Sequence, residues 1–397
     1  MVDVTIEALG QRGEGVATLD GARVYVPLAL PGEIADISVE GERGTLERLV
    51  GGSADRGEPF CPYFGQCGGC QIQHLGEELY RQFKADLVAS PLARLGITVP
   101  IDSMIPAHGE GRRRATLHAR REGAGFMRLR SHEVYPIARC PILVGQLAPA
   151  ADLARAVFAA LGEADVAMTA TLGGIDVAVR AEKARAKPHR LAPLVAQFRL
   201  SRLALNGEVV LQTTQPRVRI GPAEVDLPVG SFLQATELAE ETLAGLVLEG
   251  LGKAKNVADL FCGLGPFTLR LAERARVTAH DSDKAAVGAL DKAVRNTRGL
   301  KPVLAKARDL FREPLTRFEL ESYDAVVMDP PRAGAEAQTR ELAQSVVKTV
   351  VYVSCDPKTF ARDAAILLGG GYTLRRVTPV DQFAWSTHIE MVGVFAR

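Results

Sequence analysis

The pattern of hydrophobic and polar residues changes twice along the chain. Residues 1–57 alternate polar and apolar positions between glycine-containing turns, which predicts a small antiparallel β-barrel. Residues 58–228 mix helical periodicity with further alternating runs, which predicts a central α+β domain. Residues 229–397 alternate apolar strands with amphipathic helices, so we expect a doubly wound, mostly parallel, Rossmann-like α/β domain at the C-terminus.

The predicted strands of the last domain end in chemically useful residues. In a parallel sheet, ligands bind at the carboxyl ends of the strands, so these ends are the first places to inspect. The first strand leads into the glycine-rich loop "FCGLGPF", and the next four end in Asp281, Asp309, Asp329 and Cys355. The carboxyl edge of this sheet is therefore the predicted active site.

The glycine-rich loop favours S-adenosylmethionine over a dinucleotide. Gly263 and Gly265 let the backbone approach a ligand closely. The dinucleotide pattern requires a third glycine where this chain has Thr268, and no phosphate-binding Lys-Ser/Thr pair follows. Asp281, at the end of the next strand, is placed to accept hydrogen bonds from ribose hydroxyls. An ordinary strand–helix turn is the alternative interpretation of the loop.

Two further loops carry candidate catalytic groups. "DPPRAG" holds Asp329 and Arg332 at the sheet edge, because its two prolines restrict the backbone. In "YVSCDP", Cys355 directly follows an apolar strand and precedes a predicted helix. A helix N-terminus and a nearby arginine favour the thiolate, so we expect a lowered thiol pKa at Cys355. Cys262 has no evident basic partner and is predicted to be a packing residue.

Composition excludes some classes of protein and leaves others open. The 397 residues carry a net charge of +1, so overall charge identifies no partner. No long apolar run or signal peptide is apparent, which favours a cytoplasmic protein without a membrane span. Residues 112–130 contain seven arginines and one acid, Glu122, among apolar positions. This segment predicts strands with one basic face that could contact RNA phosphates, or else an ordinary solvated face.

Taken together and in this order, "DLFCGLGPFTL", "DPPRAG", "YVSCDP" and "HIEMV" resemble the motifs of the S-adenosylmethionine-dependent RNA 5-methyluridine methyltransferases. Residues 1–57 resemble the oligonucleotide-binding TRAM barrel of that family, and "CPYFGQCGGCQIQHL" resembles the iron–sulfur motif of its bacterial 23S rRNA branch. The resemblance spans nearly the whole chain. It implies an RNA partner, most specifically 23S rRNA, and we expect a monomer.

The resemblance also implies a covalent mechanism. C5 of uracil is a poor nucleophile until a thiolate adds to C6, and a base must later remove the C5 proton. By similarity, Cys355 is the nucleophile and Glu390 of "HIEMV" is the base, with a pKa that burial raises. The implied cofactor-binding residues are Gln234, Phe261, Gly263, Gly265, Asp281, Asp309 and Asp329. The sequence departs from the family pattern at Pro266 and in the approach to Glu390.

The cysteine-rich segment 61–70 raises a separate question. A cytoplasmic location argues against disulfides. Zinc remains an alternative because Cys67 and Cys70 have the spacing of a zinc knuckle, but the segment lacks a second close pair. Cys61, Cys67, Cys70 and the distant Cys140, which a proline follows, favour a [4Fe–4S] cluster.

Three other functions remain as alternatives. A tRNA uridine-5 methyltransferase would use the same catalytic groups. RNA 5-methylcytosine enzymes usually carry a cysteine after Asp-Pro-Pro, where this chain has Arg332. A catalytically dead RNA-binding homologue is disfavoured because Cys355, Glu390 and Asp329 are all present.

Overall fold

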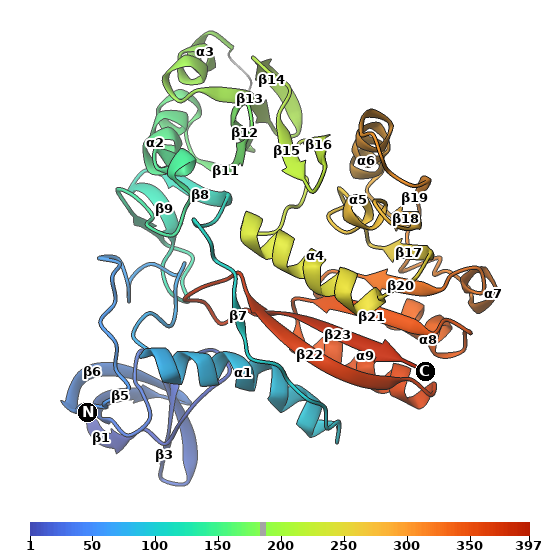
Figure 1. Ribbon diagram of the computed structural model, residues 1–397. Coiled ribbons are helices and arrows are strands. Elements are labelled where there is room, and N and C mark those ends of the chain that lie inside the picture. Colours follow the sequence, from blue (N-terminus) through green and yellow to red (C-terminus); the bar gives the residue numbers. More distant parts are fainter. Residues whose placement is uncertain (183–187) are drawn as a thin grey trace.

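The described residues form three large sheets and one two-stranded sheet. The large sheets follow one another along the chain, as the progression of colours in Figure 1 shows, except that the short strand Ile105–Pro106 belongs to the last sheet. The computed structural model describes residues 1–182 and 188–397. Within these residues, no helix is both long and apolar enough to cross a lipid bilayer.

The N-terminal sheet has six strands in the order β1-β5-β6-β4-β3-β2. Alternate residues of these strands, such as Val4, Ala17, Val24 and Ile37, point into one small apolar core. This period-two burial is what the alternating sequence predicts. The strands are β1 Val2–Thr5, β2 Ala8–Leu9, β3 Gly15–Leu19, β4 Ala22–Val26, β5 Ile34–Glu40 and β6 Arg43–Gly51.

The central sheet has seven strands in the order β10-β9-β8-β11-β12-β13-β14. Helices α2 and α3 pack on it and share its apolar core. A separate hairpin, β15–β16, follows and packs against helix α6 of the last domain. The elements are β8 Arg114–Arg120, β9 Gly123–Met127, β10 Val134–Pro136, a 3₁₀ turn at Gly145–Leu147, α2 Ala150–Leu161, β11 Ala164–Thr171, β12 Gly174–Arg180, α3 Pro188–Gln197, β13 Leu200–Leu205, β14 Glu208–Gln212, β15 Arg217–Ile220 and β16 Ala223–Asp226.

The arginines of residues 112–130 do not form the single basic face that the sequence predicted. Arg113 is buried and forms an ion pair with Glu240 at 2.6 Å. Arg130 pairs with Glu14 of the N-terminal sheet at 2.7 Å. These arginines bind neighbouring parts of the protein because their strands lie between the first and last domains.

The C-terminal sheet has the order β19-β18-β17-β20-β21-β23-β22-β7. Strands β17 to β21 are parallel to their neighbours, and β23 is antiparallel to β21 and β22. The strands are β7 Ile105–Pro106, β17 Asn256–Leu260, β18 Arg276–Asp281, β19 Val303–Ala307, β20 Ala325–Met328, β21 Thr349–Ser354, β22 Thr373–Asp381 and β23 Glu390–Ala396.

Helices cover both faces of this sheet, which confirms the doubly wound prediction. Buried side chains of α4 and α5 share one apolar cluster with the sheet, and those of α8 and α9 share another (Figure 1). The helices are α4 Glu237–Leu251, α5 Thr268–Leu271, α6 Lys284–Asn296, α7 Arg317–Leu320, α8 Glu336–Ala343 and α9 Pro357–Gly369.

Helix α1, Glu77–Arg94, packs on the C-terminal sheet although the sequence placed it in the central part of the chain. Its Val88 and Leu92 join the apolar cluster of α8 and α9. Its Lys84 is fully buried and contacts Asp381 at the end of β22 at 2.8 Å. Lys84 Nζ also donates to the carbonyl oxygens of Phe383 and His388, at 3.2 and 2.6 Å.

We expect Lys84→Met to destabilise the protein strongly. The change keeps most of the side-chain volume but leaves the buried Asp381 carboxylate without its cation, and breaking a buried ion pair in this way costs about 3–5 kcal/mol. The free energy of unfolding, measured by urea denaturation, should fall by that amount. Lys253→Met, at an exposed lysine of the same domain, is the matched control. Equal effects of the two substitutions would contradict a stabilising role for the ion pair.

Candidate active site

The glycine-rich loop lies where the strand order of the C-terminal sheet reverses. Strands β18 and β19 extend from β17 in one direction, and β20 and β21 extend in the other. Such a reversal opens a crevice at the carboxyl ends of the strands. Gly263 and Gly265 both have positive φ, and a Cβ on Gly265 would lie 2.5 Å from Leu290 of α6. The loop therefore needs glycine to turn sharply and pack against the helix.

Two of the predicted cofactor-binding carboxylates, Asp281 and Asp309, lie at the strand ends next to this loop. The Asp281 carboxylate accepts the backbone N–H of Gly263 at 2.8 Å. The Asp309 carboxylate accepts the backbone N–H of Phe311 at 3.0 Å. The rings of Phe311 and Phe261 are 5.5 Å apart, and the Phe311 side chain is half exposed. The arrangement offers two carboxylates and an aromatic wall, which suit a nucleoside.

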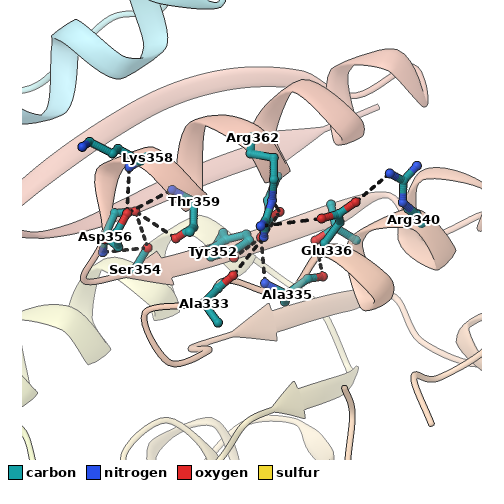
Figure 2. A network of polar contacts seen from close by, with 12 residues as sticks. Ala333, Ala335, Glu336, Arg340, Tyr352, Ser354, Asp356, Lys358, Thr359 and Arg362 are labelled. Atoms are coloured by element: carbon teal, nitrogen blue, oxygen red, sulfur yellow. Dashed lines mark hydrogen bonds and ion pairs between the residues drawn. The ribbon is translucent and has the colours of Figure 1, made fainter. Parts of the chain in front are cut away.

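The loop of residues 329–335 is attached to helix α9 by a network of polar contacts (Figure 2). Thr359 donates to the Arg332 carbonyl at 3.1 Å, and Arg362 donates to the Ala333 carbonyl at 3.0 Å. The buried Asp363 carboxylate accepts the N–H of Ala335 and the hydroxyl of Tyr352. These contacts fix Asp329 and Arg332 relative to the start of α9, where Cys355 lies.

Cys355 lies between β21 and the capped end of α9. Asp356 is the N-cap residue, and its carboxylate accepts the N–H groups of Lys358 and Thr359 at 2.9 and 3.0 Å (Figure 2). The Ser354 hydroxyl contacts the Asp356 backbone at 3.2 Å. The capping interactions hold the thiol-bearing turn in one conformation.

The expected lowering of the Cys355 thiol pKa is wrong. Burial raises the pKa of Cys355 to about 12, and the nearby carboxylates of Glu390 and Asp329 raise it further. Arg332 acts in the opposite direction but does not compensate. The sequence showed the arginine and the helix N-terminus, but the closeness of the two acids appears only in the fold. The thiol therefore stays protonated in this arrangement of charges.

The two acids beside Cys355 also have raised pKa values. Glu390 begins β23 and is only 3% exposed. Burial raises its pKa to about 7, while a hydrogen bond from Gln382 and the charge of Arg332 act to lower it. Burial and the neighbouring Glu390 hold the pKa of Asp329 well above its usual range. The rise at Glu390 was expected from sequence, and it places this carboxyl near the ionisation suited to a general base.

Two buried glutamines connect these acids. Gln234 Nε2 lies 3.3 Å from Asp329 Oδ2, and Gln382 Nε2 donates both to Gln234 Oε1 at 2.7 Å and to Glu390 Oε1 at 3.0 Å. The sequence identified Gln234 but missed Gln382. β22 runs parallel to β21, so its carboxyl end lies at the same edge, and Gln382 directly follows it. Inspecting the residue after Asp381 would have found it.

The structure also brings together the four cysteines that the sequence grouped. Cys61, Cys67, Cys70 and Cys140 line one cavity of about 290 Å³ between the 61–70 segment and the central sheet. All are free thiols, whereas Cys262 is buried in the core as predicted. Within residues 1–182 and 188–397, no three His, Cys, Asp or Glu side chains are grouped as ligands of one metal ion.

The cysteine segment contacts the loop that precedes Glu390. The backbone N–H groups of Gln71 and Ile72 both donate to the Trp385 carbonyl, at 2.8 and 3.1 Å. The Trp385 ring packs against Phe60 and Tyr80, with ring centroids 5.6 and 5.1 Å away. The cysteine cavity and the active-site edge are thus joined by direct contacts.

Comparison with known proteins identifies the family. Residues 194–397 match the family model described as tRNA (Uracil-5-)-methyltransferase, and residues 1–43 match the TRAM domain. The chain belongs to the RNA uracil-5-methyltransferase family. It is therefore an S-adenosylmethionine-dependent methyltransferase that acts on uracil in RNA.

Relatives of this uracil-5-methyltransferase cover almost its whole length. It is 45% identical over 408 residues to an uncharacterized RNA methyltransferase of Brucella suis biovar 1, covering 99% of this chain and 97% of that protein. It is 32% identical to the 23S rRNA (uracil(1939)-C(5))-methyltransferase RlmD of Halomonas elongata, covering 98% and 88%. The fold matches Pyrococcus abyssi tRNA (uracil-54, C5)-methyltransferase, solved with S-adenosyl-L-homocysteine, at a TM-score of 0.77, 21% identity and 99% coverage of both chains.

The charges around Cys355 predict that two substitutions change its rate of alkylation in opposite directions. Glu390→Gln removes a negative charge that raises the thiol pKa, so at pH 9 the alkylation of Cys355 should become several-fold faster. Arg332→Met removes the cation that lowers this pKa, so alkylation should slow. The rates are measured by mass spectrometry of the Cys355 peptide, because reagents attack the thiolate. Faster alkylation in the arginine variant would contradict the proposed balance of charges.

Proposed function

We propose that this enzyme methylates C5 of a specific uridine through a covalent bond between Cys355 and C6 of the uracil. The observation that carries the proposal is the convergence of a thiol with two carboxyls of raised pKa, Glu390 and Asp329, at the carboxyl edge of the sheet. A nucleophile and a base of intermediate pKa, at the carboxyl ends of neighbouring strands, suit this reaction.

In this mechanism the protein moves two protons and forms one transient bond. Cys355 gives its proton to a neighbouring carboxylate and adds to C6, which makes C5 nucleophilic. S-adenosylmethionine would supply the methyl group that C5 takes, with S-adenosylhomocysteine as the leaving group. Glu390 then removes the C5 proton, and elimination breaks the bond to C6 and restores the Cys355 thiolate. A Glu390 pKa of about 7 allows the carboxylate to accept this proton near neutral pH.

We assign the methyl donor to the crevice formed by the glycine-rich loop and the strand ends around it. Two carboxylates at the ends of β18 and β19 suit hydroxyl and amine groups of a nucleoside, and the half-exposed Phe311 ring suits the face of its base. The assigned residues are Gln234, Phe261, Gly263, Gly265, Asp281, Asp309 and Asp329.

We further propose 23S rRNA as the substrate and a monomer as the active form. The 32% identity with the Halomonas elongata 23S rRNA methyltransferase over 98% of this chain supports that substrate. A tRNA substrate is the alternative, and a target base inside either folded RNA must be flipped into the pocket. A catalytically dead homologue is disfavoured by the intact thiol and carboxyls.

The cysteine cavity fits a [4Fe–4S] cluster held by Cys61, Cys67, Cys70 and Cys140. A single zinc ion would draw its thiolates to within about 2.3 Å of one point, whereas these thiols surround a cavity. Gln73 lines the same cavity, and its side-chain hydrogen bond to Cys70 acts to lower the pKa of that thiol, against the burial that raises it to about 11. An amide donor there suits a sulfur acceptor. A bound cluster would supply a rigid crosslink between the 61–70 segment and Cys140.

The methyl-transfer assignment is tested with S-adenosylmethionine labelled in its methyl group. Wild-type enzyme should label unmodified 23S rRNA and not a tRNA transcript, and digestion should recover the label in 5-methyluridine. Cys355→Ala should abolish transfer because no C6 adduct can form. Cys262→Ala is the matched control, at a thiol buried in the core. Transfer that survives in Cys355→Ala would exclude this nucleophile, and labelling of tRNA alone would exclude the rRNA substrate.

The cluster is tested by purifying the protein without oxygen. The protein should be brown, with broad visible absorbance and about four iron atoms and four sulfides per chain. Cys140→Ser should remove this absorbance, whereas Cys355→Ser should retain it. Colourless protein that contains stoichiometric zinc would contradict the cluster and favour the alternative metal.

A further inference from the structure

We propose that Gln382 is a positioning residue that fixes both the Glu390 carboxylate and the Gln234 amide in the orientations needed for methyl transfer. This inference rests on the proposed function of the same site. Gln382 follows β22 and is 1% exposed, so its amide has no water to satisfy it. Every hydrogen-bonding atom of this amide instead contacts protein.

One contact determines which way the Gln382 amide faces. Its Oε1 accepts the backbone N–H of Ala235 at 2.7 Å. A backbone N–H can only donate, so the oxygen must lie on that side and the NH₂ group on the other. Both hydrogens of the NH₂ group are then used, one toward Glu390 Oε1 at 3.0 Å and one toward Gln234 Oε1 at 2.7 Å.

The fixed amide determines the orientation of the next one. Because Gln234 Oε1 accepts from Gln382, its own NH₂ group must face away from Gln382. That NH₂ group lies 3.3 Å from Asp329 Oδ2. The backbone N–H of Ala235 thus fixes the direction of all these hydrogen bonds. As a result, one amide donates to Glu390 and the other faces Asp329 with its NH₂ group. Neither glutamine can flip without placing two acceptors or two donors against each other.

This series of hydrogen bonds affects the ionisation of Glu390, the proposed base. A donor on Glu390 Oε1 stabilises the carboxylate and leaves Oε2 as the oxygen available for the C5 proton. The titratable and charged groups that face Glu390 are Asp329 at the end of β20, Cys355 at the end of β21 and Arg332 in the loop between them. Of these, only Arg332 favours the ionised base, so losing the Gln382 donor should favour the protonated form.

The test compares Gln382→Met with wild-type enzyme across pH. Methionine keeps the volume and removes the amide. The acidic limb of the kcat profile should move to higher pH, and a move from about 7 to about 8 should lower kcat at pH 7 by about fivefold. KM for RNA should change little. Because proton removal becomes slower after C6 has been attacked, the covalent protein–RNA adduct on denaturing gels should increase.

Two further variants separate positioning from stability. Gln338→Met is the matched control, because Gln338 is fully buried and its amide bonds the backbone of Leu315, away from the site. It should destabilise the fold without moving the acidic limb. Gln382→Glu keeps the acceptor for Ala235 but places an acceptor against Glu390, so it should lower kcat more than methionine does while folding normally.

The outcomes distinguish this inference from the proposed function. Suppose that the wild-type enzyme transfers methyl groups, but that Gln382→Met has the same acidic limb as Gln338→Met. This result would overturn the positioning role of Gln382 and leave the proposed function standing. Wild-type enzyme that forms no 5-methyluridine would overturn the proposed function first. If Gln382→Met does not fold, Gln382→Glu provides the test. A folded Gln382→Glu enzyme with the kcat and adduct level of the wild type would overturn the positioning role.

Discussion

The active-site edge depends on a charge that has no contact with water. Lys84 and Asp381 are both buried. The Lys84 ammonium donates three hydrogen bonds, to the Asp381 carboxylate and to the carbonyls of Phe383 and His388. Tyr80 donates to the second oxygen of Asp381. Because the two carbonyls lie at opposite ends of the loop 382–389, one cation holds the loop closed. Gln382 and Glu390 flank that loop, so the ion pair also helps to set the distance between the Glu390 carboxylate and its hydrogen-bond donor.

The charges of the site favour the neutral forms of Cys355 and Asp329 in the free enzyme. Both groups lie near Glu390, whose pKa is raised to about 7, and near the cation Arg332. A cationic methyl donor would change this balance, because a positive charge next to the three groups favours thiolate and carboxylate. The raised thiol pKa that contradicts the sequence expectation is thus compatible with a nucleophile that ionises within the complete complex. It also protects the thiol from alkylation and oxidation in the free enzyme.

The sequence predicted the parts of this protein that depend on local pattern. Regular alternation of strands and helices was sufficient for the doubly wound domain, and the rule about strand ends located Asp281, Asp309, Asp329 and Cys355 at one edge. The errors concern partners that are distant in sequence. Arg113 was expected on a basic face but pairs with Glu240, and α1 was placed in the central part but packs on the C-terminal sheet. Gln382 was missed because the inspection of strand ends stopped at Cys355 and did not extend to the end of β22.

The long-range contacts of the loop 382–389 have a consequence for biosynthesis. Lys84 and Asp381 are 297 residues apart, and the Trp385 carbonyl binds the N–H groups of Gln71 and Ile72. Domains usually fold in the order in which the ribosome releases them. Here Lys84 and the cysteine segment cannot complete their contacts until the loop 382–389 has been translated. A nascent chain that stops before β22 would lack Asp381 and the carbonyls of Phe383 and His388, so the Lys84 ammonium would have none of these acceptors.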